Sequence, residues 1–317
     1  MSARRVYLGI DGGGTKTEFI AIDDSRAVVA RTTTGTTYHP QIGLDGAVER
    51  LRQGVAAICE ALSIAPADIA HAFFGLPGFG EHRLIDPQLD AACGAILGHG
   101  RYACGNDMVC GWAGSLAGED GINLVAGTGS IGYGERRGQS ARIGGWSEVF
   151  GDEGSAYWIA IQGLNAFSRM SDGRLARGPL HTVVRHALAL SSDLDICAAV
   201  VGEQGMGRDE IAGLAQLVSQ AAQEGDPIAH RILEQAAAEL AELAGTLRTL
   251  LGYEPDEPAL LSWSGGVLTH QHVVREQFGR RLDALGRFEL IAPRHGPGIG
   301  AALQALRLSG IAGSIAP

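Results

Sequence analysis

The fold is decided by residues 6–22, which read VYLGIDGGGTKTEFIAI. The apolar run Val6–Ile10, the glycines that follow it and the alternating residues Glu18–Ile22 predict two antiparallel strands joined by a tight turn. This turn is not a Walker P-loop, because Thr15 rather than a lysine follows Gly14 and because a strand comes next. Glycines can still let backbone N–H groups approach a phosphate closely. An ordinary hairpin turn is the alternative.

The residues that follow this hairpin predict an α/β unit. A third strand is expected at residues 27–33, and the apolar spacing in residues 44–62 matches one face of a helix. A strand at 72–76, a helix at 84–97 and a strand at 102–104 come next. Strands that alternate with helices indicate a sheet with parallel strands, and the hairpin would form its antiparallel edge.

A second unit begins near residue 121 and repeats the plan of the first. A strand at 122–125, the turn Gly127-Thr128-Gly129-Ser130 and a returning strand at 131–134 are predicted. Asp226 followed by Pro227 predicts a capped helix start. The remainder is mainly helical, with helices expected at 153–169, 180–190, 208–223, 226–251, 268–285 and 300–308, and strands at 259–263 and 288–292.

Composition excludes several classes of protein. The 25 Lys and Arg against 35 Asp and Glu give a net charge of −10, which disfavours nucleic acid or a membrane surface as the main partner. The five cysteines contain no Cys-x-x-Cys pair, so neither a disulfide framework nor a zinc knuckle is expected. No apolar run approaches the roughly 18 residues of a membrane span. We therefore expect a cytoplasmic protein that binds small molecules.

Two aspartates stand where phosphoryl transfer would need carboxylates. Asp107 follows a strand and precedes an apolar helix, so it is either a helix cap or a general base that takes the proton of an acceptor hydroxyl. Asp11 ends the first strand, where it would serve Mg²⁺, usually through water.

Residues 144–158 read GGWSEVFGDEGSAYW and form the densest segment of the chain. Carboxylates that accept bonds from sugar hydroxyls, beside an indole that stacks on the ring, are one way in which proteins hold sugars. The alternative is a loop with Asp152 and Glu153 at a helix start and the tryptophans in the core. A further pair, Gly265-Gly266, ends a strand and opens a helix, which suits either a nucleotide or close helix packing.

In combination, these segments resemble the N-acetylglucosamine kinases of the BadF/BadG/BcrA/BcrD ATPase family, within the sugar kinase, Hsp70 and actin superfamily. The resemblance runs in order over nearly the whole chain, and Gly151–Trp158 is its most specific stretch. It implies an α/β fold with two RNase H-like (actin-like ATPase) lobes and a ligand cleft between them. Residues 1–118 would form the first lobe, to which a last helix at about 297–317 returns, and residues 119–296 the second, with helical insertions.

The resemblance also implies roles for individual residues. Asp107 matches the base that deprotonates the sugar 6-hydroxyl, and Asp11 would serve Mg²⁺. The residues implied to hold ATP are Gly12, Gly13, Gly14, Thr15, Lys16, Gly127, Thr128, Gly129 and Ser130 at the phosphates, and Ala222, Gly265 and Gly266 at adenosine. The residues implied to bind sugar are Tyr38, His39, Asp107, Gly145, Trp146, Ser147 and Asp152.

One departure bears on the substrate. This chain has Tyr38-His39 followed by Pro40 where such kinases have Asn-His in a loop that contacts the sugar. N-acetylglucosamine is the first expectation, and glucosamine, N-acetylmuramic acid or another hexose derivative stay open. An ATPase that activates an iron–sulfur dehydratase or reductase is a second hypothesis, with Cys104 and Cys110 as the close cysteine pair, and a non-catalytic sugar sensor is a third. The architecture is also compatible with a homodimer.

Overall fold

The computed structural model describes residues 5–311, and these divide into two compact units. Unit 1 comprises the chain up to Asp120 together with the residues from Ala292 onward, and unit 2 comprises Gly121–Ile291. Each unit has its own cluster of buried apolar side chains. Both are α/β units built on a mixed five-stranded sheet, as the resemblance implied.

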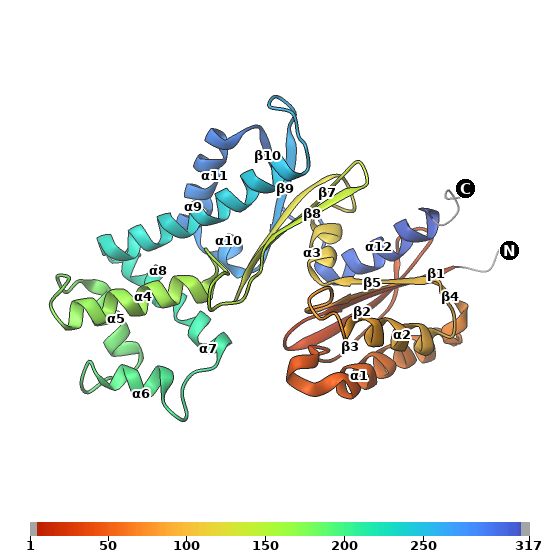
Figure 1. Ribbon diagram of the computed structural model, residues 1–317, viewed down its shortest axis with the longest axis horizontal. Helices are drawn as coiled ribbons and strands as arrows, with labels where there is room; N and C mark the ends of the chain where they lie inside the picture. The colour runs from red at the N-terminus through yellow and green to blue at the C-terminus, as the bar shows by residue number, and fades with distance from the viewer. Residues whose placement is uncertain (1–4, 312–317) are drawn as a thin grey trace. The chain divides into compact units, whose positions relative to one another are not determined.

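The sheet of unit 1 combines antiparallel and parallel pairing (Figure 1). Its first pair is the predicted hairpin, in which Asp11 lies opposite Glu18. Parallel strands extend the other side, as expected for strands that alternate with helices. In spatial order the strands are β3 (Val28–Gly35), β2 (Lys16–Asp23), β1 (Val6–Gly12), β4 (Ile69–Leu76) and β5 (Tyr102–Asn106).

Helices cover both faces of this sheet (Figure 1). Those of the first face are α1 (His39–Leu62) and α2 (Asp86–Leu97), with the short turn η1 (Pro66–Asp68) between them. The buried side chains of α1 recur at helical spacing, at Ala47, Leu51, Val55 and Ile58. The second face holds α3 (Met108–Ser115) and α12 (Pro297–Ile311).

The last helix therefore packs on unit 1, in the part of it that the structure describes. A Cβ atom on Gly9 would lie 2.0 Å from the backbone nitrogen of Ala302, so glycine permits this close approach of β1 and α12. Residues 312–317, to which this helix was predicted to extend, lie outside the described residues.

The sheet of unit 2 repeats the pairing order of unit 1. In spatial order it consists of β8 (Gln139–Gly144), β7 (Ser130–Arg136), β6 (Gly121–Ala126), β9 (Ala259–Ser264) and β10 (Phe288–Leu290). The pairs β8–β7 and β7–β6 are antiparallel, and the pairs β6–β9 and β9–β10 are parallel. The predicted repetition of the N-terminal plan is thus confirmed by the topology.

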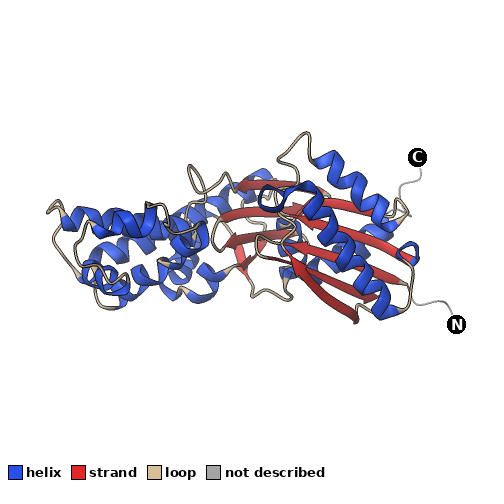
Figure 2. Ribbon diagram, turned by 90° about the horizontal axis from the view of Figure 1, so that it is seen from below, coloured by secondary structure: helices blue, strands red, loops and turns tan. Residues whose placement is uncertain are grey.

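Helices make up the remainder of unit 2, and those of one part of it pack on each other without strands (Figure 2). That part consists of α4 (Ala156–Ser171), α5 (Pro179–Ala187), α6 (Asp195–Val201), α7 (Arg208–Gly213) and α8 (Ala215–Gln223). The sheet is covered by α9 (Pro227–Leu250), α10 (Gly266–His270) and α11 (His272–Leu285). The predicted cap is confirmed, because the Asp226 side chain accepts from the N–H groups of Ile228 and Ala229.

Several expected elements of unit 2 were wrong in extent. The helix expected at 208–223 is two, α7 and α8, which meet at Leu214, and the one expected at 268–285 breaks at Gln271 into α10 and α11. The helix expected from residue 153 begins only at Ala156, because Gly154 has φ +76° and Ser155 is the cap. Both β8 and α6 were missed. Most of β8 is polar or small, which is typical of an edge strand.

Candidate functional site

Unit 1 gathers its candidate catalytic residues at the carboxyl ends of neighbouring strands. Asp11 in β1 lies opposite Gly75 in β4, and Leu76 at the end of β4 lies opposite Asn106 at the end of β5. Asp107 follows directly. Open α/β sheets bind ligands at this edge, because loops and helix starts converge there.

Asp107 does not cap the helix that it precedes. It has helical backbone angles, φ −60° and ψ −23°, and its side chain makes no cap hydrogen bond. Asn106 serves that end instead, since its Oδ1 accepts from the N–H of Met108 at 3.2 Å while its Nδ2 donates to the carbonyl of Phe79. The alternative interpretation of Asp107 as a cap is therefore wrong, and the neighbouring asparagine carries the role.

Asp11 lies close to other carboxylates. Burial, followed by the negative charges of Asp107 and Glu18, raises the pKa of Asp11 to about 8. The Cys110 thiol and the charge of Lys16 act in the opposite direction. The negative charge near Asp11 favours a bound cation. Mg²⁺ that accompanies a nucleotide needs only one or two protein carboxylates, so Asp11 fits this ion, although residues 5–311 contain no group of three or more His, Cys, Asp or Glu side chains that could hold a metal.

The first glycine turn, Gly12–Lys16, is anchored by threonine hydroxyls, and part of it is exposed to solvent. The Thr36 hydroxyl donates to the carbonyl of Gly13 at 2.7 Å, and the buried Thr17 hydroxyl donates to Thr37 at 3.0 Å. Gly14, Thr15 and Lys16 are exposed. The turn therefore presents backbone and hydroxyl groups to solvent at the strand edge where Asp11 lies.

Tyr38 and His39, the pair that departs from the family pattern, start α1 beside the loop Pro77–His82. The rings of His39 and His82 meet edge to face with centroids 5.2 Å apart, and Gly78 faces the Tyr38 ring. Nδ1 of His39 is buried without a hydrogen-bond partner, and burial lowers the pKa of this histidine. The same loop is held by Asn106 through Phe79, so this pair lies in the surroundings of Asp107.

The second glycine turn, Gly127–Ser130, joins β6 to β7 in unit 2. Its carbonyl oxygens at Gly127 and Thr128 accept from the first N–H groups of α4. The Ser130 hydroxyl donates to the carbonyl of Glu153 at 2.7 Å, and the Thr128 hydroxyl donates to Asp209 at 3.0 Å. The third glycine pair lies against it, since a Cβ on Gly265 would come within 2.8 Å of the Gly127 nitrogen.

Two other residues, Gly266 and Ala222, are implied to border adenosine. Gly266 begins α10, directly after Gly265. Ala222 is 2% exposed and belongs to the helical core of unit 2, where its carbonyl accepts from Gly225. Its contact with a nucleotide stays a prediction.

The Gly-Trp loop, residues Gly145–Asp152, is strained and partly exposed. Ser147 and Asp152 have positive φ angles of +84° and +57°, unusual for residues other than glycine. Trp146 is 69% exposed, so the expectation of a core tryptophan is wrong at this position. Asp152 is buried instead and accepts from the N–H of Ser130 and from Arg208. Its contact with a sugar stays a prediction.

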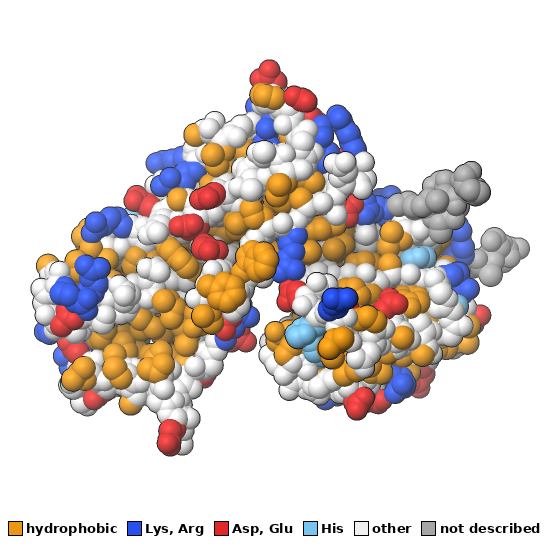
Figure 3. Space-filling view, in the orientation of Figure 1, with side chains coloured by type: hydrophobic (Ala, Val, Ile, Leu, Met, Phe, Trp, Pro, Cys, Tyr) orange, Lys and Arg blue, Asp and Glu red, His pale blue; other side chains and the backbone are white. Residues whose placement is uncertain are grey.

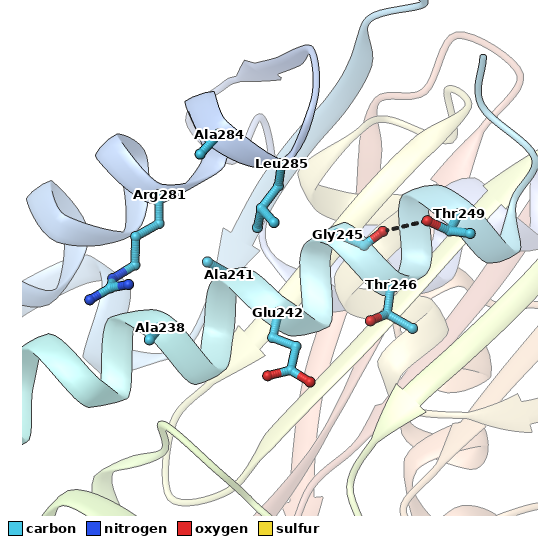
Figure 4. Close-up of a pocket in the computed structure, with 9 residues that line it drawn as sticks. All are labelled: Ala238, Ala241, Glu242, Gly245, Thr246, Thr249, Arg281, Ala284 and Leu285. Carbon is cyan, nitrogen blue, oxygen red and sulfur yellow. Dashed lines mark hydrogen bonds between the residues drawn. The ribbon is translucent and has the colours of Figure 1, made fainter. Parts of the chain in front are cut away.

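A cavity of about 670 Å³ lies elsewhere in unit 2, between α9 and α11 (Figure 4). Its lining includes Glu242 and Thr246 of α9 and Arg281 and Leu285 of α11. None of the predicted site residues lines it. Since it lacks converging carboxylates or glycine turns, the candidate site does not lie there.

The two cysteines of the iron–sulfur hypothesis have separate environments. The Cys110 thiol is buried and points to the carbonyl of Ile10 at 3.7 Å, next to Asp11. Cys104 lies against Cys93, and this contact together with burial raises the pKa of its thiol. In neither environment do several cysteine thiols converge on one point where they could bind an iron–sulfur cluster.

Comparison with known proteins identifies the family of this chain. Residues 8–305 match the model of the BadF/BadG/BcrA/BcrD ATPase family. The chain belongs to this family. An N-acetyl-D-glucosamine kinase of Dictyostelium discoideum is 26% identical, over 96% of this chain and 98% of its own. An N-acetylmuramic acid/N-acetylglucosamine kinase of Clostridium acetobutylicum is 28% identical, over 88% and 90%.

The chain is also similar in fold to a protein whose structure has been solved. The crystal structure of a putative N-acetylglucosamine kinase from Chromobacterium violaceum is 25% identical, with a TM-score of 0.73 over 94% of this chain and 98% of that one.

None of the helices in residues 5–311 combines the length and apolarity that a membrane span needs. On the face that Figure 3 shows, basic and acidic side chains are interspersed rather than gathered in one basic patch.

Sequence reasoning missed the polar residues that hold the two turns. Thr36 and Thr37 are separated from the first turn by the two strands β2 and β3, and Arg208 and Asp209 lie about eighty residues from the second. The sequence around these residues indicates only a loop and a helix start, so no local signal predicts their contacts with the turns.

Proposed function

We propose that this protein is a kinase that transfers the γ-phosphoryl group of ATP to the 6-hydroxyl of an amino sugar, with N-acetylglucosamine as the first substrate to test. The observation that carries the proposal is the position of Asp107. Its side chain does not cap α3, it lies near Asp11 at the carboxyl edge of the sheet, and Asn106 takes the structural role. Membership of an ATPase family and the names of the relatives support the same reaction class.

Asp107 would act as the general base. A sugar hydroxyl becomes a good nucleophile only as its proton leaves, and a carboxylate within hydrogen-bond reach accepts that proton while the bond to phosphorus forms. The first glycine turn would direct its N–H groups and the Thr15 hydroxyl at the β- and γ-phosphates. The second turn would add the Thr128 hydroxyl and further N–H groups.

Asp11 would hold Mg²⁺, directly or through water. When bound, Mg²⁺ neutralises charge on the phosphate oxygens. The residues of this chain contribute the orientation: the register of β1 with β4 fixes Asp11, and the Asn106 bonds fix the start of α3 and with it Asp107. Placing both reactants in a fixed geometry supplies much of the rate enhancement in such reactions.

The Gly-Trp loop would bind the sugar. Trp146 offers an exposed indole for stacking on a ring face, and the Ser147 hydroxyl lies beside it at a strained position that a packed loop must maintain. Tyr38 and His39 would contribute from unit 1 and distinguish between amino sugars. A tyrosine in place of the smaller asparagine of the pattern alters the space and the hydrogen bonds available to the sugar substituents.

The test is release of ADP from Mg²⁺-ATP in a coupled assay with a panel of sugars. The panel contains N-acetylglucosamine, glucosamine, N-acetylmuramic acid, N-acetylmannosamine and glucose. We expect strong stimulation by one amino sugar and slow hydrolysis without sugar. The phosphorylated position is identified by phosphorus–proton correlation in the NMR spectrum of the product. Absence of stimulation by every sugar would contradict the proposal.

A further inference from the structure

The start of α7 contacts the second glycine turn. Arg208, the first residue of this helix, donates from Nη2 to Oδ2 of Asp152 at 2.7 Å, and Asp209 accepts from the hydroxyl of Thr128 at 3.0 Å. Two consecutive residues of opposite charge thus reach the turn, one through Asp152 and one directly. Neither residue belongs to the motifs that the sequence indicates around this turn.

Asp152 connects Arg208 to the turn. Its side chain is 5% exposed, and Oδ1 accepts from the N–H of Ser130 at 3.3 Å. A Cβ on Gly129 would lie 2.7 Å from Oδ2 of Asp152 and 2.8 Å from Nη2 of Arg208. The carboxylate and the guanidinium therefore lie directly against the backbone of the turn, at a position where a Cβ atom would force one of these side chains to shift.

Arg208 also balances the charge of a second carboxylate. Its Nε lies 3.2 Å from Glu148 in the Gly-Trp loop, so one guanidinium serves Glu148 and Asp152 together. Because a guanidinium has donors on several edges, it can hold both acids at once. Without it, two carboxylates would remain beside the turn, one of them buried, and would repel an incoming polyphosphate.

Asp209 has the opposite effect on the same turn. A hydroxyl has one proton to donate, so Thr128 cannot donate to a phosphate while it donates to Asp209. The carboxylate of Asp209 adds a negative charge at that point. A phosphate that binds to Thr128 must therefore displace Asp209 from this hydroxyl.

We propose that Arg208 and Asp209 tune the affinity of the second glycine turn for ATP in opposite directions. Arg208 is a positioning residue that neutralises Asp152 and Glu148 and fixes the turn, and Asp209 competes with the nucleotide for the Thr128 hydroxyl. This inference rests on the proposed function in one respect, that Gly127–Ser130 binds nucleotide phosphates.

The test compares Arg208→Gln with Asp209→Asn in the full chain. Isothermal titration measures the Kd of Mg²⁺-ATP without sugar, and steady-state assays measure KM for ATP and kcat. We expect Arg208→Gln to raise Kd and KM for ATP about tenfold, and Asp209→Asn to lower them about threefold, with kcat at saturation within about twofold of the original chain. Arg208→Lys, which keeps the charge but loses the planar fork, is expected to give an intermediate value.

Two further variants separate charge from folding. Arg280→Gln removes an arginine whose pair with Glu276 is largely exposed on α11, and it is expected to leave all three constants unchanged. Adding Glu148→Gln to Arg208→Gln removes one of the two carboxylates left unbalanced, and is expected to recover about threefold in Kd. A purely structural role for Arg208 would show no such recovery, whereas the thermal unfolding midpoints report any loss of fold.

The inference is overturned if Arg208→Gln and Asp209→Asn shift the Kd of ATP in the same direction, or if neither shifts it. That outcome is distinct from failure of the proposed function, in which the original chain binds ATP but no sugar stimulates ADP release. In that case the titrations still decide whether the start of α7 controls nucleotide affinity.

Discussion

The two glycine turns occupy equivalent places in the two sheets, yet their surroundings differ in charge. Around the first turn lie Asp11, Asp107 and Glu18, and the nearby cation Lys16 is exposed at the turn itself. Around the second turn, the carboxylates of Asp152 and Glu148 share the guanidinium of Arg208. At the first turn the carboxylates gather beside Asp11, whereas at the second turn an arginine lies beside the backbone and pairs with two carboxylates.

This difference separates two tasks that a repeated fold can perform. An acidic cluster at a strand edge is suited to a cation and to a proton acceptor, whereas a turn with an arginine beside its backbone is suited to an anion. We infer that the carboxylates Asp11 and Asp107 of unit 1 contribute the chemistry, and that Arg208 of unit 2 contributes nucleotide affinity. Variants of these carboxylates and of Arg208 should therefore change different constants.

Asp107→Asn should give the largest effect, because it removes the proposed base but keeps the shape of the side chain. We expect kcat for sugar phosphorylation to fall about 10²- to 10⁴-fold, with the Kd of ATP unchanged. Asp45→Asn, an exposed acid on α1, is the matched control and should keep full activity. Equal turnover by Asp107→Asn and the original chain would remove Asp107 from the mechanism.

Asp11→Asn should come next. Loss of the proposed Mg²⁺ carboxylate is expected to lower kcat/KM about a hundredfold and to raise the Mg²⁺ concentration needed for half-maximal rate. The unfolding temperature should stay equal or rise, because one of three neighbouring carboxylates is gone. A Mg²⁺ titration identical to that of the Asp45→Asn control would contradict this assignment.

The glycines of the two turns should respond differently to alanine. A Cβ on Gly14 meets nothing within 4 Å, so Gly14→Ala should leave the unfolding free energy unchanged and raise only KM for ATP. Gly129→Ala would push against Asp152 and Arg208 and should lower the unfolding free energy by about 1–3 kcal/mol. Denaturant melts of both variants measure this, and equal losses would show that the turns are supported alike.

Trp146→Ala should have little effect on the fold. The residue is 69% exposed, so stability should change by less than about 0.5 kcal/mol. If the indole stacks on the sugar, KM for the sugar should rise about five- to tenfold while KM for ATP stays constant. Phe150→Ala, 74% exposed in the same loop, is the control. Parallel changes in both variants would indicate a general loop effect instead of stacking.

Local sequence determined most of the fold. The hairpin of residues 6–22 and the apolar spacing in α1 were read correctly, because the periodicity of buried residues follows directly from strand and helix geometry. The polar edge strand β8 and the break between α7 and α8 were missed. Neither leaves a clear apolar period in the sequence, and β8 packs against α9 and α7 against α4, both far away along the chain.

The candidate site was predictable only in part. The glycine turns and Asp107 lie in short, recognisable segments, whereas the balance of charge depends on contacts between residues far apart in the chain. Asp152 and Arg208 are 56 positions apart, and which of two adjacent polar residues caps α3 was settled only by the bonds of Asn106. Long-range electrostatics cannot be derived from local patterns.

The most direct test of the division between the units is to measure Kd for ATP and kcat at saturation in Asp107→Asn and Arg208→Gln side by side. We predict that Asp107→Asn loses kcat and keeps Kd, while Arg208→Gln loses affinity and keeps kcat within about twofold. Loss of the same constant in both variants would show that Asp107 and Arg208 do not have separate roles.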